Sequence, residues 1–149
     1  MSMRESILVF PQTAEYAVRA VAFLASTFGG APVRVKDVAG ATGIPTNYLS
    51  KTLNHLAHVG LLRSARGPQG GFTLAVPPES ISLGAIAEIF CGDDRHQCLL
   101  GGGICGEKPQ CAVHMRWLPV ATQVREFLDN TTIAQIVTAP PLTTEATHT

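Results

Sequence analysis

Glycine and proline divide residues 34–78 into short segments that leave few choices of fold. Two helix-forming stretches, at about residues 35–42 and 46–59, are separated only by the Gly-Ile-Pro of residues 43–45. A short helix, a glycine-containing turn and a second helix form the helix-turn-helix motif. This stretch therefore predicts a helix-turn-helix.

A hairpin is predicted directly after the second helix. Strand-forming residues occur at 60–64 and 72–74, and the glycine-rich residues 66–71 between them form a tight turn. A plain surface hairpin has the same pattern, but a hairpin in this position is typical of a winged helix-turn-helix. We therefore expect a mainly α-helical fold with one small β-hairpin.

An apolar helix is predicted at residues 13–28, before this unit. Its apolar side chains extend most of the way round the helix, which indicates deep burial, and two glycines follow it. Thr13 is expected to cap the helix, and Glu15 lies in the first turn, where the helix dipole favours a carboxylate. Phe28 is expected to close the buried stripe.

The 46–59 helix has one apolar and one polar face. Leu49, Leu53 and Leu56 recur at i, i+4 and i+7 and should face inward. The opposite face carries side chains that can hydrogen-bond to base edges and phosphates, although an ordinary solvated face has the same composition. The glycines of the hairpin turn allow the backbone to approach a phosphate or a minor groove closely.

The distribution of charge favours DNA as the partner. Residues 34–76 contain five basic groups and one acidic group, whereas residues 77–149 contain four basic and eight acidic groups. A basic half beside an acidic half is typical of a polyanion-binding module joined to a non-binding one. The candidate contacts to double-stranded DNA are Arg34, Lys36, Thr46, Asn47, Tyr48, Ser50, Lys51, Arg66, Gly67, Pro68, Gln69 and Gly70.

Two further helices are expected in the second half of the chain. Ser82 should cap a helix that ends near Cys91. A longer helix should begin at Ala112, be kinked or started by Pro119, and end at Asn130. Its apolar residues alternate by four and three, as in a coiled-coil seam, although one core stripe looks similar. These residues are Val113, Trp117, Val120, Val124 and Phe127.

The end of the chain is expected to be less ordered. Residues 132–137 could pack back as a short turn, and residues 138–149, rich in proline and threonine, predict a disordered tail. We accordingly divide the chain into a DNA-binding domain at 1–78, a segment with the cysteines and the long helix at 79–137, and the tail.

All four cysteines lie in a stretch with little apolar content. Cys98, Cys105 and Cys111 are separated by six and five residues, and His114 follows after two more. Three thiolates and an imidazole can hold tetrahedral zinc or an iron–sulfur cluster. The gaps are wider than the two to four residues usual in zinc sites, which favours a cluster. Cys91 is interpreted as a small buried side chain, with a ligand or redox role as the alternative.

Other classes of function have less support. No secretory h-region and no apolar run of 18 residues is present, so a cytoplasmic protein with reduced thiols is expected. No nucleophile–base constellation or phosphate loop indicates an enzyme. The cysteines could instead form a thiol–disulfide switch or a structural zinc site. A ferredoxin-like electron carrier is disfavoured because it leaves the basic half and the hairpin without a role.

The chain resembles the IscR-type iron–sulfur winged-helix transcription regulators (the Rrf family). The resemblance covers nearly all of residues 13–137. It implies a homodimer on a pseudo-palindromic promoter site, with the 13–28 helix also packed in the dimer. It further implies a cluster, [2Fe–2S] rather than [4Fe–4S], whose occupancy tunes DNA binding. The matching residues are Tyr16-Ala17-Val18, Asn47-Tyr48-Leu49, Gly60-Leu61, Arg66-Gly67-Pro68-Gln69-Gly70-Gly71, the three spaced cysteines, His114 and Trp117.

The resemblance also implies the cluster ligands. Cys98, Cys105 and Cys111 would be three of them and His114 the fourth. Relatives without that histidine use a carboxylate near the start of the first helix, from the other subunit, and Glu15 occupies that position here. Two departures are a six-residue first gap, one longer than the IscR pattern, and Gln69 in place of a wing-tip glycine. The implied function is promoter binding controlled by iron–sulfur status, redox stress or nitric oxide.

Overall fold

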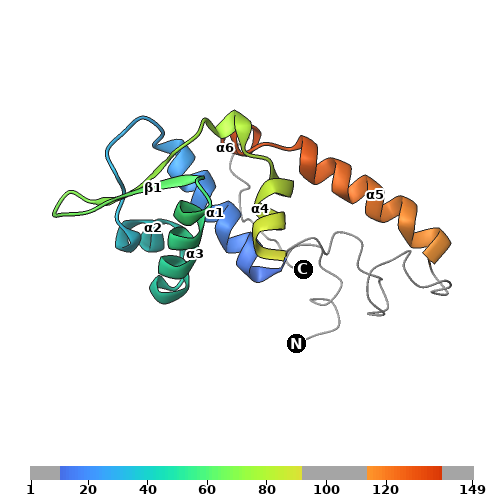
Figure 1. Ribbon diagram of the computed structural model, residues 1–149, viewed down its shortest axis with the longest axis horizontal. Helices are drawn as coiled ribbons and strands as arrows, with labels where there is room; N and C mark the ends of the chain where they lie inside the picture. Colours follow the sequence, from blue (N-terminus) through green and yellow to red (C-terminus); the bar gives the residue numbers. More distant parts are fainter. Residues whose placement is uncertain (1–10, 92–113, 139–149) are drawn as a thin grey trace, which may run out of the picture.

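The computed structural model describes residues 11–91 and 114–138. It is mainly α-helical with one two-stranded antiparallel hairpin, which confirms the winged helix-turn-helix (Figure 1). In chain order the elements are α1 (Gln12–Ser26), α2 (Val35–Thr42), α3 (Thr46–His58), β1 (Leu62–Ala65), β2 (Gly71–Leu74), the 3-10 helix η2 (Pro78–Ser80), α4 (Leu83–Cys91), α5 (His114–Asn130) and α6 (Ile133–Thr138).

Helix α1 lies at the centre of the fold. Ala17, Ala20 and Val21 have no solvent exposure, and α1 packs against α2, α3, α4 and α6. Alanines leave room for neighbouring helices to approach closely, which explains how one helix can contact so many others. The deep burial expected from the sequence is confirmed.

Both ends of α1 differ from the expectation. The N-cap residue is Pro11, whose extended backbone starts the helix at Gln12, so Thr13 lies inside the first turn and does not cap it. At the other end α1 stops at Ser26. Phe28 therefore lies beyond the helix and is 52% exposed, so its predicted place in the buried stripe was wrong.

The turn between α2 and α3 has the expected form. Gly43 follows α2 with φ of 73°, and its N–H donates to the carbonyl of Ala39 at 2.8 Å. Glycine adopts this left-handed conformation without steric cost, which ends α2 abruptly. Leu49, Leu53 and Leu56 of α3 are fully buried, as predicted.

The second strand of the hairpin is bridged to the segment before α2. Leu62 pairs with Leu74 and Ala65 with Gly71. The N–H groups of Val33 and Phe72 donate to each other's carbonyls at 3.0 and 2.8 Å. Phe72 is the second residue of β2, close to the turn, so this bridge joins the turn end of the hairpin to the segment that leads into α2.

The start of α4 and the end of α5 are tied together. Ser82 Oγ accepts a hydrogen bond from the N–H of Ala85 at 3.0 Å, which confirms the predicted cap. The N–H of Leu83 donates to Thr131, and that of Ile133 to Ile81, both at 2.8 Å. Residues 132–137 are thus not a simple turn, because most of them form α6, whose fully buried Ile133 joins the core around α1.

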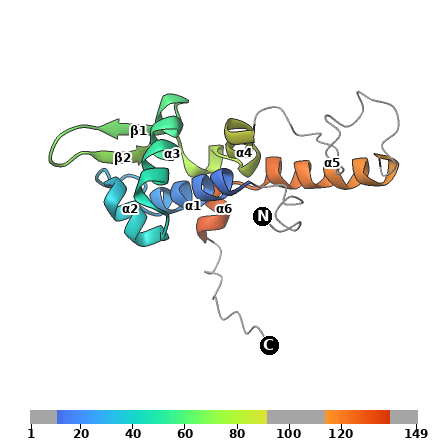
Figure 2. The same ribbon diagram turned by 90° about the horizontal axis from the view of Figure 1, so that it is seen from below.

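Helix α5 extends away from the other elements (Figures 1 and 2). It continues through Pro119, which therefore does not start the helix, and it ends at Asn130 as predicted. Val120 and Phe127 are 45% and 60% exposed, and Trp117 and Val124 are partly buried. The predicted stripe thus faces solvent over much of its length in the single chain.

Several predictions fall outside the described residues. They concern the helix start at Ala112, the seam position Val113, the ligand candidates Cys98, Cys105 and Cys111, and the tail from 139 onward. Helix α4 ends at Cys91, and the structure does not describe that side chain. Within the described residues, no helix has both the length and the apolar character needed to cross a bilayer.

Candidate nucleic-acid interface

Helix α3 presents a polar stripe on the side opposite its buried leucines. Asn47, Lys51, Asn54 and His58 occupy positions i, i+4, i+7 and i+11, and all four are exposed. At 3.6 residues per turn this spacing keeps the four side chains on one line along the helix. Ser50, beside the stripe, is partly buried. The stripe offers amides, an ammonium group and an imidazole to any partner that covers α3.

The two flanks of this stripe have different surroundings. Thr46 is exposed at the first position of α3. Tyr48, on the other flank, is 55% exposed, and its ring makes an edge-on contact with Tyr16 of α1 at a centroid distance of 6.3 Å. One flank is therefore open, and the other is in contact with a neighbouring helix.

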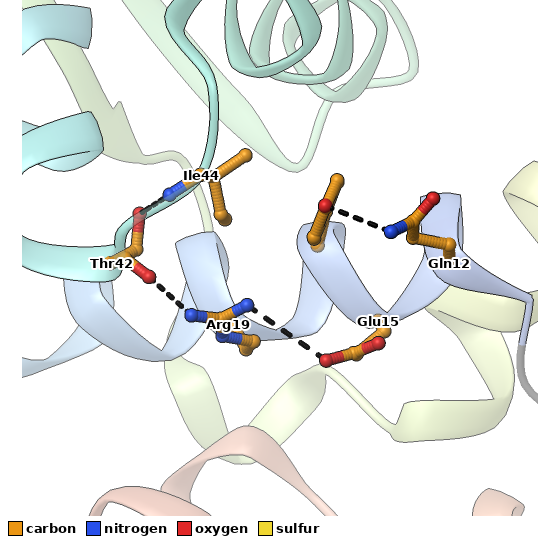
Figure 3. A network of polar contacts seen from close by, with 6 residues as sticks. Gln12, Glu15, Arg19, Thr42 and Ile44 are labelled. Carbon is orange, nitrogen blue, oxygen red and sulfur yellow. Dashed lines mark hydrogen bonds and ion pairs between the residues drawn. The ribbon is translucent and has the colours of Figure 1, made fainter.

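A polar network joins α1 to the turn between α2 and α3 (Figure 3). Arg19 donates a hydrogen bond to the carbonyl of Thr42 and lies 3.8 Å from a carboxylate oxygen of Glu15. Thr42 Oγ1 donates to Val38 at 2.7 Å and accepts from the N–H of Ile44 at 3.4 Å. The Arg19 guanidinium thus links the first half of α1 to the end of α2.

The position of Arg19 beside the end of α2 was not predicted from the sequence. Its spacing of four residues from Glu15 is a sign of an ion pair, and its spacing of three from Tyr16 places the two on one face of the helix. Neither spacing shows that α2 ends beside them, because that depends on the tertiary fold.

The wing carries positive charge close to α3. Arg66 lies in the exposed turn between the strands, and Arg63 is exposed on β1, opposite Thr73. Arg63 is a further cation that the sequence-based list of contacts omits. Within the turn, Gly67 has φ of 101° and accepts a hydrogen bond from the N–H of Gly70 at 2.9 Å. Pro68 and Gln69 are exposed at the tip, whereas Gly70 is buried.

Two more cations lie at the start of α2. Arg34 and Lys36 are exposed, and Arg34 directly follows Val33, which bridges to Phe72 of the wing. The chain has no acidic residue from 38 to 78, so both α3 and the wing lack a carboxylate of their own. The α2–α3–wing unit therefore carries positive charge, which attracts a polyanion.

The candidate metal ligands are only partly within the described residues. Glu15 is exposed on the first turn of α1, and His114 is the first residue of α5. Among the residues that the structure describes, no three histidine, cysteine or acidic side chains lie together in a way that could hold a metal. The donors themselves, three thiolates with an imidazole or a carboxylate, suit an iron–sulfur cluster chemically.

Comparison with known proteins agrees with this architecture. The family model Rrf2, described as an iron-dependent transcriptional regulator, matches residues 10–139. The transcriptional regulator IscR of Vibrio parahaemolyticus is 32% identical over 124 residues, which cover 83% of this chain and 73% of the relative.

Two solved structures have the same fold. T. potens IscR superposes with a TM-score of 0.71 at 29% identity, covering 87% of this chain and 86% of that one. CymR of B. subtilis, described as the global cysteine regulator, superposes with a TM-score of 0.74 at 25% identity, covering 87% and 96%. With its winged helix-turn-helix and a family match over nearly the whole length, the chain belongs to the Rrf2 family of transcription regulators.

Proposed function

We propose that this protein is a homodimeric transcription regulator whose promoter binding is controlled by an iron–sulfur cluster. The observation that carries the DNA-binding part is the exposed polar stripe of α3 beside a basic wing, in a unit without a carboxylate on either element. Binding to promoter DNA would place the protein in the cytoplasm.

In the proposed complex α3 lies in the major groove. Asn47, Ser50 and Lys51, near its N-terminal end, face base edges, because amide, hydroxyl and ammonium groups match the donors and acceptors there. Thr46 and the cations Arg34, Lys36 and Arg66 contact phosphates. The wing tip approaches the neighbouring backbone or minor groove. The first 78 residues would thus act as the DNA-binding domain.

Homodimerisation is supported by the exposed apolar stripe of α5. Helix-turn-helix proteins that bind two half-sites need a symmetric dimer, and a second α5 would cover Val120 and Phe127. Large exposed apolar side chains at coiled-coil spacing favour another copy of the same helix as the partner.

DNA binding is tested by selecting duplexes from a random-sequence library with the purified protein. We expect enrichment of a two-fold symmetric site, bound with an affinity that falls steeply as salt rises. Failure to enrich any duplex, with and without cluster, would contradict promoter binding.

Cys98, Cys105 and Cys111 are proposed as three ligands of the cluster, with His114 as the fourth and Glu15 as its rival. When bound, a [2Fe–2S] cluster supplies one-electron chemistry and sensitivity to oxidants and nitric oxide. Glu15 already pairs with Arg19, which in turn holds the carbonyl of Thr42. If Glu15 were the ligand, binding of the cluster would compete with its ion pair to Arg19. Because Arg19 also donates to the carbonyl of Thr42, this competition would affect the turn before α3.

The cluster is tested by absorption spectra with iron and acid-labile sulfide analysis on anaerobically purified protein. We expect a coloured protein with two irons and two sulfides per chain, in keeping with a [2Fe–2S] cluster. Of His114→Ala and Glu15→Ala, the variant that loses iron more easily identifies the fourth ligand. A colourless protein with one zinc per chain would refute the cluster and leave DNA binding intact.

A cysteine switch without a cluster is the second candidate. It is supported by the likeness to CymR of Staphylococcus aureus, which has been solved in an oxidized form. If it is correct, oxidation of metal-free protein will change DNA affinity reversibly, and substitution of the cysteines will remove the change.

A further inference from the structure

We infer that Tyr48 and His55 are positioning residues, which fix the rotation of α3 about its own axis through ring contacts with two other helices. This inference rests on the proposed docking of α3 in the major groove. It separates these two residues from the stripe of Asn47, Lys51 and Asn54, which would face the DNA, and it gives the exposed ring of Tyr48 a role other than base contact.

The first contact is at the N-terminal end of α3. The rings of Tyr48 and Tyr16 meet edge-on, with centroids 6.3 Å apart and an interplanar angle of 71°, a favoured aromatic geometry. Tyr16 is itself held, because its hydroxyl accepts a hydrogen bond from Gln12 Nε2 at 2.9 Å and the Arg19 guanidinium lies 6.0 Å from its ring. Tyr48 therefore packs against the ring of Tyr16, which has contacts of its own with Gln12 and Arg19.

The second contact is two helical turns later. The imidazole of His55 lies 5.4 Å from the ring of Phe90, between centroids, at an interplanar angle of 49°. Seven residues separate Tyr48 from His55, so both lie on the same flank of α3. Their partners come from different helices, α1 and α4, and the flank is therefore supported at two separate points.

Two supports on one flank add to the resistance that the packed core already offers to a roll of α3 about its axis. A roll of the helix has to move both rings out of their contacts with Tyr16 and Phe90, in addition to disturbing the buried leucines. Hydrogen bonds to base edges need their donors and acceptors placed within about 0.5 Å and 10–20°. Loss of either ring contact should therefore weaken specific binding, although neither ring touches DNA.

The test uses the duplex selected by the wild-type protein, with affinities measured by fluorescence anisotropy across a range of salt. We expect His55→Ala to weaken specific binding by about two- to tenfold, with no change in the salt slope or in non-specific affinity. His55→Phe, which restores an aromatic ring without a charge, should bind like wild type. Tyr48→Phe should also bind like wild type, and Tyr48→Ala should not.

Phe90→Leu tests the same contact from α4, away from the proposed DNA face. It should weaken binding as much as His55→Ala, and the double variant should bind no more weakly than either single one. If His55→Ala does not fold, Phe90→Leu alone tests whether the His55–Phe90 contact positions α3. Thermal unfolding shows whether each variant is folded. Lys51→Ala is the matched variant on the stripe, and it should weaken specific binding because it removes a proposed contact to a base edge.

Three results would overturn the inference. If His55→Phe binds as weakly as His55→Ala and both reduce the salt slope, His55 contacts DNA directly. If His55→Ala and Phe90→Leu both bind like wild type while Lys51→Ala is weakened, α3 docks as proposed but the ring contacts do not position it. If Lys51→Ala is also unaffected, the docking of α3 itself is wrong.

Discussion

Gly71 is the residue on which the join between the wing and α2 depends most directly. Its φ is 154°, and a Cβ atom at this position would lie 2.4 Å from the carbonyl oxygen of Val33, which accepts the bridging hydrogen bond from Phe72. Gly71→Ala is therefore expected to lower the free energy of unfolding by about 1–3 kcal/mol. Urea denaturation measures this change.

Gly40→Ala is the matched control for that substitution. Gly40 is exposed within α2, its φ lies outside the left-handed region, and nothing lies within 4 Å of an added Cβ. Alanine should leave stability unchanged or raise it by up to about 1 kcal/mol, because it is the better helix former. If Gly71→Ala and Gly40→Ala lowered the free energy of unfolding equally, the close contact of Gly71 with Val33 would not be the cause of the loss.

Arg66 permits a separate test of the wing. If its guanidinium neutralises a phosphate, Arg66→Ala should weaken binding to all duplexes alike and lower the salt slope by about 0.9. Arg116→Ala removes the same charge from exposed α5, away from the wing, and should leave the slope unchanged (Figure 1). Binding isotherms at several salt concentrations distinguish the two, and an unchanged slope for Arg66→Ala would contradict wing contact.

For single residues, the sequence predicts burial and capping where a local pattern determines them. The spacing of Leu49, Leu53 and Leu56 placed them correctly in the core, and Ser82 caps α4 as its type suggests. Thr13 was misassigned because Pro11 starts the helix first. The contact of Arg19 with Thr42 was not predicted, because it depends on where α2 comes to lie in the fold.

Among the elements, α5 carries the exposed apolar stripe that we propose as the dimer interface. If two copies pair through it, Phe127→Glu should place unpaired charge in the interface and shift the dimer toward monomer at micromolar concentration. Because Phe127 is 60% exposed in the single chain, the fold should be kept. Sedimentation velocity measures the change, and circular dichroism checks the fold.

Met115→Glu is the control for the α5 stripe. Met115 is 82% exposed, but it lies off the stripe formed by Trp117, Val120 and Val124. It should leave the oligomeric state unchanged. A Phe127→Glu protein that is as dimeric as wild type would show that another surface forms the dimer.

The sequence predicted where the helices and strands lie along the chain better than it predicted what packs against them. Short helix, glycine turn, helix and hairpin follow one another as expected, because turn residues act locally. The α5 stripe, in contrast, has one periodicity whether it covers its own core or another copy. The position of α5, extended away from α1 to α3, leaves much of the stripe exposed to solvent in the single chain, which the periodicity does not predict (Figure 2).

For the whole molecule, the order of the elements along the chain puts the three proposed cysteine ligands between α4 and α5. Residues 92–113 connect α4, which packs on α1, to α5, and α6 returns to the core around α1. A ligand held by this connection can therefore bias the arrangement of both neighbouring helices, and it shifts the population toward the state that it binds better. Whether the cysteines hold a metal centre, and which one, does not follow from helix or strand patterns, because it depends on ligand geometry.

The most direct test of this account is the affinity of the protein for one selected duplex before and after removal of its cluster. The two affinities are measured anaerobically, by anisotropy, on the same preparation at one salt concentration. The account predicts that they differ by about 5- to 150-fold, the usual range of coupling between two sites. Equal affinities, with cluster content verified by iron and sulfide analysis, would contradict control of promoter binding by the cluster.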